Sequence, residues 1–561
     1  MKSLQRWFPF LSWPRPDAAL LRGEALAGLT VGLMVIPQGV AYAALAGMPL
    51  VTGIYASMLP ALVAVLFSAS TRLSVGPTAL SCLLIGTSLT GLAEPGSARW
   101  VELAVWLALL TGLLQVVLGW ARFGWLLNLI SSPVLMGFTQ AAALLIIASQ
   151  MPALLGFAAG WRELLQQPQI HLPSAAFGLI SLALLVLVRR WRPAFPSVLF
   201  IVVGTAAVSA GTGFEAAGGK VVGTLPAGLP TLALPGWLDW HTLGQLLLPT
   251  MVITLVSFLE TASSAKVENQ RGGQRWNQDQ DLIGQGLAKI ASGLSGAFPT
   301  SSSFSRSALN LYAGARTGWA TVISVGVVLL ALLVFTPTLR HVPQAVLAAI
   351  VLVAVVGLLK PAAFVRLWRV SRVEASTAGV TFLITLLAAP KLYWGVLAGV
   401  LMGLSHFLHH RLHPRIIEVG LHPDGSLRDR HLWHLPPLAP HLYALRMDAE
   451  LDFAAASGFE RAIVEHLAAH PGVRHVCLFA QPINRMDATG VEIFGQLRHQ
   501  LASRGITLHI SGLKLPVEKV LRSAGELPNG PLLKLYRTDA DALVALARLR
   551  EDPIDLAAVM I

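Results

Sequence analysis

Long runs of hydrophobic residues recur through the first 410 positions of the chain. A helix needs about 20 apolar residues to cross the hydrocarbon of a bilayer, and a shorter run suffices where the helix is paired or broken. We therefore expect about fourteen membrane spans. They lie near residues 26–45, 52–67, 77–93, 100–119, 132–150, 172–189, 196–211, 246–265, 281–294, 301–313, 319–336, 343–359, 373–389 and 393–409. The runs near 77, 281 and 301 are short and rich in Gly, Pro or Ser.

Beyond residue 437 the pattern changes to short segments that are typical of a soluble domain. Strand-like and amphipathic helical runs alternate there, and this order predicts an α/β fold. The expected strands are Tyr443–Met447, Val476–Phe479 and Thr507–Ile510, and the expected helices are Gly458–His466, Val491–Leu501 and Val517–Leu521. The predicted division is an N-terminal cytoplasmic segment at 1–25, a transmembrane domain at 26–410 with halves at about 26–235 and 243–410, a linker at 411–436 and a soluble domain at 437–555.

Composition and charge agree with a membrane protein. Hydrophobic residues make up 54% of the chain and charged residues only 12%, whereas about 25% of a soluble domain is charged. The net charge is +12, but most basic residues sit beside apolar runs, which indicates membrane topology rather than nucleic-acid binding. Arg22 precedes the first span, and Arg411 and Arg415 follow the last one. With an even number of spans, both ends of the chain are expected in the cytoplasm.

Polar interruptions recur at equal spacing in the two halves of the apolar region. In the first half, Gln38 lies in the first span and Pro77 breaks the third; in the second half, Glu260 lies in the eighth span and Pro299 breaks the tenth. Both pairs are separated by 39 residues. Seven spans per half would invert the second half relative to the first. Two broken helices then bring their N-termini together, and unpaired N–H groups and helix dipoles form an anion site. The alternative is that both breaks are simple helix kinks.

Glu260 is an acidic residue deep in the eighth span. An ionised carboxylate at the bilayer centre costs about 2.5–3.5 kcal/mol on insertion scales, so it should be paired, protonated or facing water. Beside an anion site, this carboxyl can take up a proton and so couple proton binding to anion binding. The alternative is a structural ion pair with Lys266 on the same helix or with Arg306 across the site.

Residues beside both breaks have the chemistry to bind an anion. The segment 300–306 combines a hydroxyl-rich helix start with Arg306, whose positive charge does not titrate. Gln38 and Tyr42 lie four residues apart, on one face of the first span. Small residues also promote close helix packing in membranes, and Gln38 and Tyr42 are equally explained as packing groups.

The sequence shows no signature of an enzyme, a cofactor or a metal centre. Two cysteines give neither a disulfide framework nor a metal cluster. We find no nucleotide-binding glycine fingerprint, no Walker loop and no zinc-binding His-Glu-x-x-His pattern. The His-rich stretch from His406 to His413 is better explained as the interfacial end of a juxtamembrane helix than as a metal site. Any transport would then be driven by a gradient of H⁺ or Na⁺ rather than by ATP.

In these residues the chain resembles the sulfate permease family of anion transporters, and the likeness runs in order along nearly the whole chain. The matching segments are Ala27–Gly32, Ile36–Ala43, Ser74–Pro77, Ser132–Thr139, Ser303–Asn310, Ala313–Thr317 and Val342–Ile350. The soluble tail is similar to the STAS domain that this family carries, through the segment Asn484–Gly490 at a strand-to-helix turn.

The resemblance implies an α-helical integral membrane protein of about 14 spans, built as a 7+7 inverted repeat with core and gate domains and followed by a soluble α/β STAS domain. It also implies a homodimer and an elevator-like movement of the core. Carried over by position, Glu260 is the proton-coupling carboxylate. The substrate-binding residues are Gln38, Tyr42, Thr78, Ser303, Phe304, Ser305 and Arg306.

The turn in the STAS segment contains a candidate regulatory site. In related regulatory domains the hydroxyl residue at this turn can be phosphorylated, which makes Thr489 a candidate together with Asp487. Either residue also suits the N-cap of the following helix, and for a permease tail this structural role is favoured. A regulatory partner at the STAS domain follows from the same resemblance.

Together these features predict a secondary transporter of a small inorganic anion in the inner membrane, with proton-coupled sulfate symport favoured. The alternatives are bicarbonate or dicarboxylate transport with sodium or proton coupling, or anion exchange. A nucleobase permease is less favoured, because such permeases typically lack a STAS tail and the Ser-Arg motif. A membrane-anchored signalling module is also less favoured, because an inert anchor has no use for Glu260. The expected partners are the anion, the lipid bilayer and a second copy of the chain, and no nucleic acid.

Overall fold

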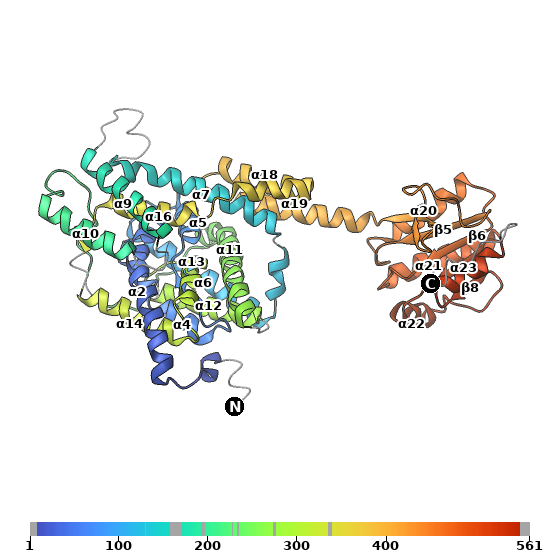
Figure 1. Cartoon of the computed structure of the whole chain (residues 1–561), viewed down its shortest axis with the longest axis horizontal. Helices are drawn as coiled ribbons and strands as arrows, with labels where there is room; N and C mark the ends of the chain where they lie inside the picture. The colour runs from blue at the N-terminus through green and yellow to red at the C-terminus, as the bar shows by residue number, and fades with distance from the viewer. Residues whose placement is uncertain are drawn as a thin grey trace. The chain divides into compact units, whose positions relative to one another are not determined.

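The computed structural model describes residues 8–129, 131–157, 171–191, 197–226, 228–232, 235–272, 276–334 and 339–549. The chain forms two compact units that divide after Gly403 (Figure 1). The first unit is almost entirely helical, and the second combines a sheet with helices.

The first unit follows the predicted series of spans. Its helices are η1 (Pro9–Ser12), α2 (Ala18–Leu45), α3 (Thr52–Tyr55), α4 (Leu59–Phe67), α5 (Ala79–Leu89), α6 (Ala98–Trp120), η2 (Gly124–Leu129), α7 (Ser132–Leu155), α9 (Leu172–Trp191), α10 (Ser197–Thr212), α11 (Trp240–Gly272), α12 (Gln278–Leu294), α13 (Phe304–Tyr312), α14 (Trp319–Val334), α16 (Gln344–Val356), α17 (Pro361–Val370), α18 (Arg372–Leu387) and α19 (Tyr393–Leu412). Two short strands, β1 (Val75–Gly76) and β2 (Ser301–Ser302), precede α5 and α13.

Every predicted span coincides with a helix or with a helix joined to a broken segment. Six helices in the described part of the chain are long and apolar enough to cross a membrane by length and composition. Several others are shorter, as expected for helices that are broken or that pack inside the protein. Helix α17 was not predicted from the sequence. The helix that follows it, α18, lies beside α19 (Figure 1). The sequence of α17 does not stand out as a span, because it carries arginines among its apolar residues. None of its side chains is buried.

Close helix crossings hold the first unit together. Where α2 crosses α14, a Cβ on Gly28 would lie 2.5 Å from the carbonyl oxygen of Ala320. Where α6 crosses α12, a Cβ on Gly286 would lie 2.6 Å from the carbonyl oxygen of Gly112. Helices inside a membrane gain little from burying apolar surface, so small residues that allow close backbone contact are the main stabilising feature.

The helices sort by packing into two groups. Helices α2, α4, α6, α12 and α14 pack on one another, and α5, α11 and α13 join them. Helices α7, α9, α16 and α18 form the second group, with α10 against α9. The first group contains both broken segments, so it carries the residues of the candidate site.

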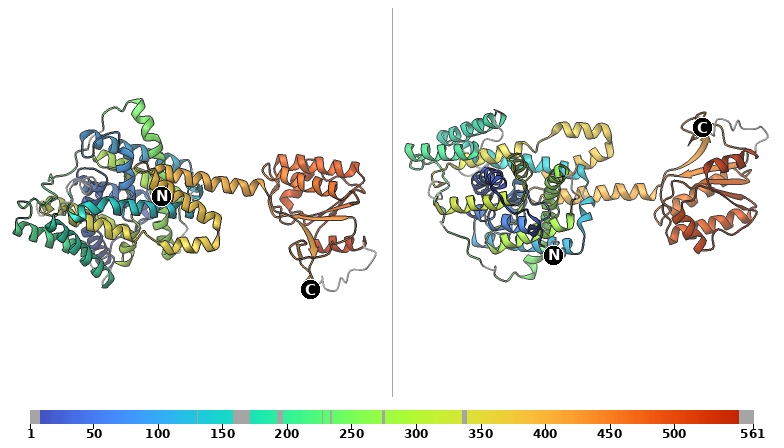
Figure 2. Two further views of the ribbon diagram at one scale, coloured as in Figure 1. Left: turned by 90° about the horizontal axis from the view of Figure 1, so that it is seen from above. Right: turned by 60° about the horizontal axis from the view of Figure 1, so that its bottom comes forward.

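The second unit contains one six-stranded sheet with the order β4-β3-β5-β6-β7-β8. Strands β5 to β8 are parallel, and β3 is antiparallel to both β4 and β5. Its elements are β3 (Ile416–Leu421), β4 (Leu427–Asp429), β5 (Leu442–Met447), α20 (Ala456–Ala469), β6 (His475–Phe479), α21 (Ala488–Ser503), β7 (Thr507–Ser511), α22 (Leu515–Ser523), β8 (Leu533–Tyr536) and α23 (Asp539–Ala547). Helices α20, α21 and α22 lie on one face of the sheet and α23 lies on the other (Figure 2), and their buried side chains join two separate apolar clusters.

All three strands and three helices predicted for the soluble domain are present. The predicted linker at 411–436 is wrong, because this segment forms the end of α19 and the strands β3 and β4. Ile417 and Val419 in β3 are buried in the apolar cluster that includes side chains of α23. Their apolar run is short and lies between residues rich in His, Arg and Pro, so only pairing with β5 reveals it as a strand.

Candidate anion-binding site

The two broken segments of the first unit meet each other. Strands β1 and β2 pair antiparallel, with Val75 opposite Ser302 and Gly76 opposite Ser301. Each strand leads within a few residues into a helix, α5 after β1 and α13 after β2. Because the paired strands run in opposite directions, the chain enters the two helices from opposite sides. The equal spacing of the breaks predicts this crossing.

Hydroxyl residues begin both helices. The Thr78 side chain caps α5 by accepting a hydrogen bond from the backbone N–H of Ser81, at 3.3 Å. The Ser303 side chain caps α13 in the same way, accepting from the N–H of Arg306 at 3.5 Å. An N-cap satisfies one of the four free N–H groups at a helix start, and the positive end of the helix dipole remains. Both helix starts therefore favour a nearby negative charge.

Glu260 on α11 contacts the start of α5 directly. One oxygen of its carboxylate, Oε2, accepts hydrogen bonds from the hydroxyls of Thr78 and Ser81, each at 3.1 Å. Lys266 is exposed, and among the described side chains no ion pair joins Glu260 to Lys266 or to Arg306. The alternative of a structural ion pair is therefore not what the structure shows, and Glu260 is held by neutral donors.

Arg306 joins the two broken segments from the α13 side. Its side chain is 2% exposed. Nε donates to the Ser74 hydroxyl at 3.2 Å, and Nη1 donates to the carbonyl oxygen of Pro77 at 2.9 Å. Nη2 is buried and has no hydrogen-bond partner among the described residues. A buried donor without a partner is costly, so this nitrogen is available to an anion at the crossing.

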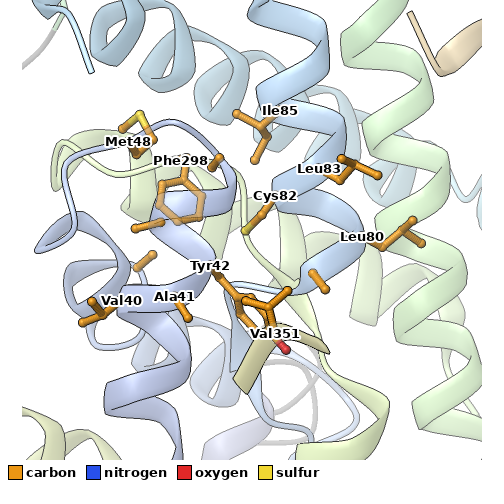
Figure 3. Close-up of a cluster of buried hydrophobic side chains, with 14 of the residues drawn as sticks. Val40, Ala41, Tyr42, Met48, Leu80, Cys82, Leu83, Ile85, Phe298 and Val351 are labelled. Carbon is orange, nitrogen blue, oxygen red and sulfur yellow. The ribbon is translucent and has the colours of Figure 1, made fainter. Parts of the chain in front are cut away.

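The remaining predicted residues lie in different environments. Gln38 on α2 is buried, and its Oε1 has no partner in the described structure. Tyr42 is buried in the apolar cluster that Figure 3 shows with Cys82, Phe298 and Val351. Ser303 is half-buried at the α13 cap, whereas Phe304 and Ser305 are exposed in the first turn of α13. The structure therefore brings Thr78, Glu260 and Arg306 together and leaves Phe304 and Ser305 outside this buried group.

A buried lysine beside the site was missed from the sequence. Lys289 on α12 is completely buried, and its Nζ donates to Oε1 of Gln115 at 2.9 Å. The Gln115 amide nitrogen donates in turn to the Thr254 carbonyl and to the Ser257 hydroxyl, both at 3.1 Å and both on α11. A charged residue within the predicted span 281–294 is as unusual as Glu260, and this was the signal that could have identified it.

Other buried carboxylates have structural partners. Asp281 at the start of α12 accepts from the N–H and hydroxyl of Ser70, at 2.9 and 2.6 Å, and from the indole of Trp276 at 2.7 Å. Glu24 on α2 accepts backbone N–H groups at the start of α14, including that of Ala320 at 2.9 Å. These bonds pin loops and helix ends, which explains the burial of both groups without a role in transport.

The candidate regulatory residues lie at the start of α21. Asp487 is its N-cap and accepts from the N–H groups of Gly490 and Phe453, at 2.8 and 2.9 Å. The structural role considered for Asp487 is therefore confirmed. Thr489 is exposed in the first turn of the helix, and its phosphorylation stays a prediction.

A cavity of about 510 Å³ lies elsewhere, between α9 and α10. It is lined mostly by apolar side chains, and none of the candidate site residues contributes to it. Among the described residues, no group of three or more His, Cys, Asp or Glu side chains is placed to hold a metal ion.

Comparison with known families decides the identity of the chain. The model of the sulfate permease family matches residues 21–381, and that of the STAS domain matches residues 437–542. The chain belongs to the sulfate permease family. Members of this family are anion transporters and not enzymes, so the crossing of β1 and β2 is a candidate transport site.

Relatives of this sulfate permease match along most of its length. A probable sulfate transporter of Mycobacterium tuberculosis is 33% identical over 517 residues, which cover 90% of this chain and 92% of the relative. The chloroplastic sulfate transporter 4.1 of Arabidopsis thaliana is 31% identical and covers 92% of this chain and 79% of its own. A sodium-independent sulfate anion transporter of Bos taurus is 30% identical and covers 93% and 89%.

Solved structures share the fold of this permease. The murine Solute Carrier 26 family member A9 anion transporter in its inward-facing state has a TM-score of 0.87 at 20% identity, covering 97% of this chain and 94% of its own. The transmembrane domain of the cyanobacterial bicarbonate transporter BicA has a TM-score of 0.58 at 20% identity, covering 69% and 99%. The helical membrane unit followed by a STAS domain is thus the established architecture of this chain.

Proposed function

We propose that this sulfate permease carries sulfate across the cell membrane together with protons. The relatives named above as sulfate transporters support the choice of anion. The observation that supports proton coupling is the contact of the Glu260 carboxylate with Thr78 and Ser81, at the helix start that faces the crossing.

Competition for the same donors would couple the proton to the anion. In the ionised state, Glu260 occupies the hydroxyls of Thr78 and Ser81 and adds a negative charge beside Arg306. Both effects oppose the entry of an oxyanion. Protonation removes the charge and weakens the hold on the hydroxyls, which then turn to the anion together with the free Nη2 of Arg306. Because linkage is reciprocal, a bound anion equally favours the bound proton.

Sulfate suits the donors of this site. It presents oxygens in all directions, and the site offers hydroxyls, helix N-termini and a guanidinium to replace its water shell. Gln38, Tyr42, Ser303, Phe304 and Ser305 complete the proposed binding residues. The exposed position of Phe304 and Ser305 requires a movement of the first turn of α13, or of the second helix group, for them to contact the anion.

The two helix groups support transport by an elevator-like movement. The group that carries both broken segments would move as one body against the group of α7, α9, α16 and α18. We place both ends of the chain in the cytoplasm, the protein in the inner membrane and a second copy beside it. The STAS domain would receive a regulatory partner or a phosphate at Thr489, where the helix N-terminus favours negative charge.

Uptake into proteoliposomes tests the proposal. Labelled sulfate, bicarbonate, fumarate and uracil are offered to the purified full chain under an imposed pH gradient or sodium gradient. We expect sulfate to accumulate under an inward proton gradient and to be indifferent to sodium. Accumulation of another substrate without sulfate, or dependence on sodium alone, would overturn the proposal.

A further inference from the structure

Lys289 is a buried basic residue that the proposed coupling of Glu260 and Arg306 does not use. Its Nζ donates to Oε1 of Gln115, and that amide is fixed by its own bonds to Thr254 and Ser257. The Gln115 nitrogen is occupied as a donor, so its oxygen can only face a donor. This arrangement fixes the lysine amine beside α11 through Gln115.

The lysine is connected to the crossing through the backbone of α11. Ser257, which accepts from Gln115, offers its carbonyl oxygen to the hydroxyl of Ser301 in β2 at 3.1 Å. Glu260 follows one turn later on the same helix and interacts electrostatically with Lys289. The charged or titratable groups that interact with Glu260 in the described structure are Tyr42 on α2, Cys82 on α5, Lys289 on α12 and Arg306 on α13.

The charges of this group add up differently in its two protonation states. When Lys289 is protonated, it and Arg306 together contribute two positive charges. With Glu260 protonated, a dianion balances the site, and with Glu260 ionised, a monoanion balances it. Uncompensated charge in a water-poor membrane interior is strongly disfavoured, so the balanced combinations are the ones that cross.

We infer that Lys289 sets the charge of the transported anion: because of this lysine, the site carries a divalent oxyanion with one proton and a monovalent anion with none. The inference rests on the proposed proton coupling at Glu260. Without the lysine, Arg306 alone remains. A monoanion is then balanced only with Glu260 protonated, and a dianion is not balanced in either state.

The test compares sulfate with chloride, whose charges do not change over the pH range of the assay. Purified full-length protein is reconstituted, and uptake of labelled sulfate and labelled chloride is measured as external pH is lowered. We expect sulfate uptake by the unchanged protein to rise with acidity and chloride uptake not to. In Lys289→Met, the ratio of sulfate to chloride uptake should fall by about tenfold or more, because one unit charge acts at short range in a poorly screened site. Chloride uptake should become acid-dependent.

Two matched variants separate charge from packing. Lys289→Arg keeps the charge and should keep the preference for sulfate, and Lys266→Met removes an exposed lysine of the neighbouring helix and should change nothing. If Lys289→Met does not give a monodisperse protein, Lys289→Gln carries the same change of charge with a polar group to meet Gln115. Neutral variants that keep the sulfate-to-chloride ratio of the unchanged protein within threefold would overturn the inference.

A binding measurement distinguishes failure of this inference from failure of the proposed function. The binding of labelled sulfate to the purified full chain is measured in competition with chloride. This measurement gives the preference for sulfate over chloride even in a protein that does not accumulate sulfate. If the unchanged protein shows no proton-driven uptake of sulfate, the proposed function is wrong. If Lys289→Met keeps the preference for sulfate in the same binding assay, Lys289 does not set the charge of the bound anion.

Discussion

Removing the hydroxyl of Ser81 tests the competition between proton and anion at the start of α5. Ser81 is buried, and its Oγ donates to Oε2 of Glu260 at 3.1 Å. Ser81→Ala removes this donor and leaves the helix intact, because alanine is the best helix former and the Ser81 N–H that Thr78 caps is retained.

The size of the effect follows from the bond that is lost. A hydrogen bond to a charged group contributes about 1.5–3 kcal/mol. At 3.1 Å this O–H···O bond is slightly longer than usual, so we take the lower value. About 1.4 kcal/mol corresponds to one pH unit. Because the bond stabilises the ionised carboxylate, its loss makes protonation easier, and the pH of half-maximal sulfate uptake should rise by about one unit.

The assay is initial sulfate uptake into proteoliposomes over a series of external pH values. Ser88→Ala is the matched control, since Ser88 is a buried serine of the same helix without a bond to Glu260 among the described contacts. We expect the control to reproduce the profile of the unchanged protein. A Ser81→Ala profile that overlays that of the control would refute the competition mechanism.

Two further predictions concern Arg306 and the STAS domain. Arg306→Lys keeps the positive charge, but a lysine amine cannot reach both Ser74 and Pro77. Sulfate uptake should therefore fall at least about tenfold, and thermal stability should drop as well. Uptake equal to that of the unchanged protein would show that the guanidinium geometry is not needed. In the STAS domain, burial and then the neighbouring His475 lower the pKa of His509 to about 4 from its ordinary 6.5. The folded domain therefore binds fewer protons than the unfolded chain between these values, so its free energy of unfolding should fall by about 2 kcal/mol as pH drops through this window, allowing for solvent screening. Chemical denaturation of residues 404–561 should show this loss, and His509→Gln should remove most of it; an equal loss in the variant would contradict the assignment.

Much of the fold can be predicted from patterns in a single sequence. Apolar runs place every span because the bilayer demands length and hydropathy, and neither depends on tertiary detail. The strands β3 and β4 escaped detection because their stability comes from pairing with β5, which sequence periodicity does not report. Helix α17 was not predicted for a related reason, since a short segment with arginines among apolar residues resembles a polar loop.

The site was predictable where chemistry and spacing coincide. The equal separation of breaks placed Thr78, Glu260 and Arg306 together, since an inverted repeat leaves few other arrangements. The carboxylate's true partners could not be predicted, because the choice between Ser81 and a cation depends on side-chain geometry. The place of Lys289 could not be predicted from the breaks, because it lies on α12 and reaches the site only through Gln115 and α11.

The most direct test of proton coupling is sulfate accumulation by Glu260→Gln under an inward proton gradient. Glutamine has nearly the shape of the protonated carboxyl but cannot release a proton, so the variant should exchange labelled for unlabelled sulfate and fail to accumulate it. The unchanged protein should do both. Gradient-driven accumulation by Glu260→Gln at the level of the unchanged protein would contradict the account.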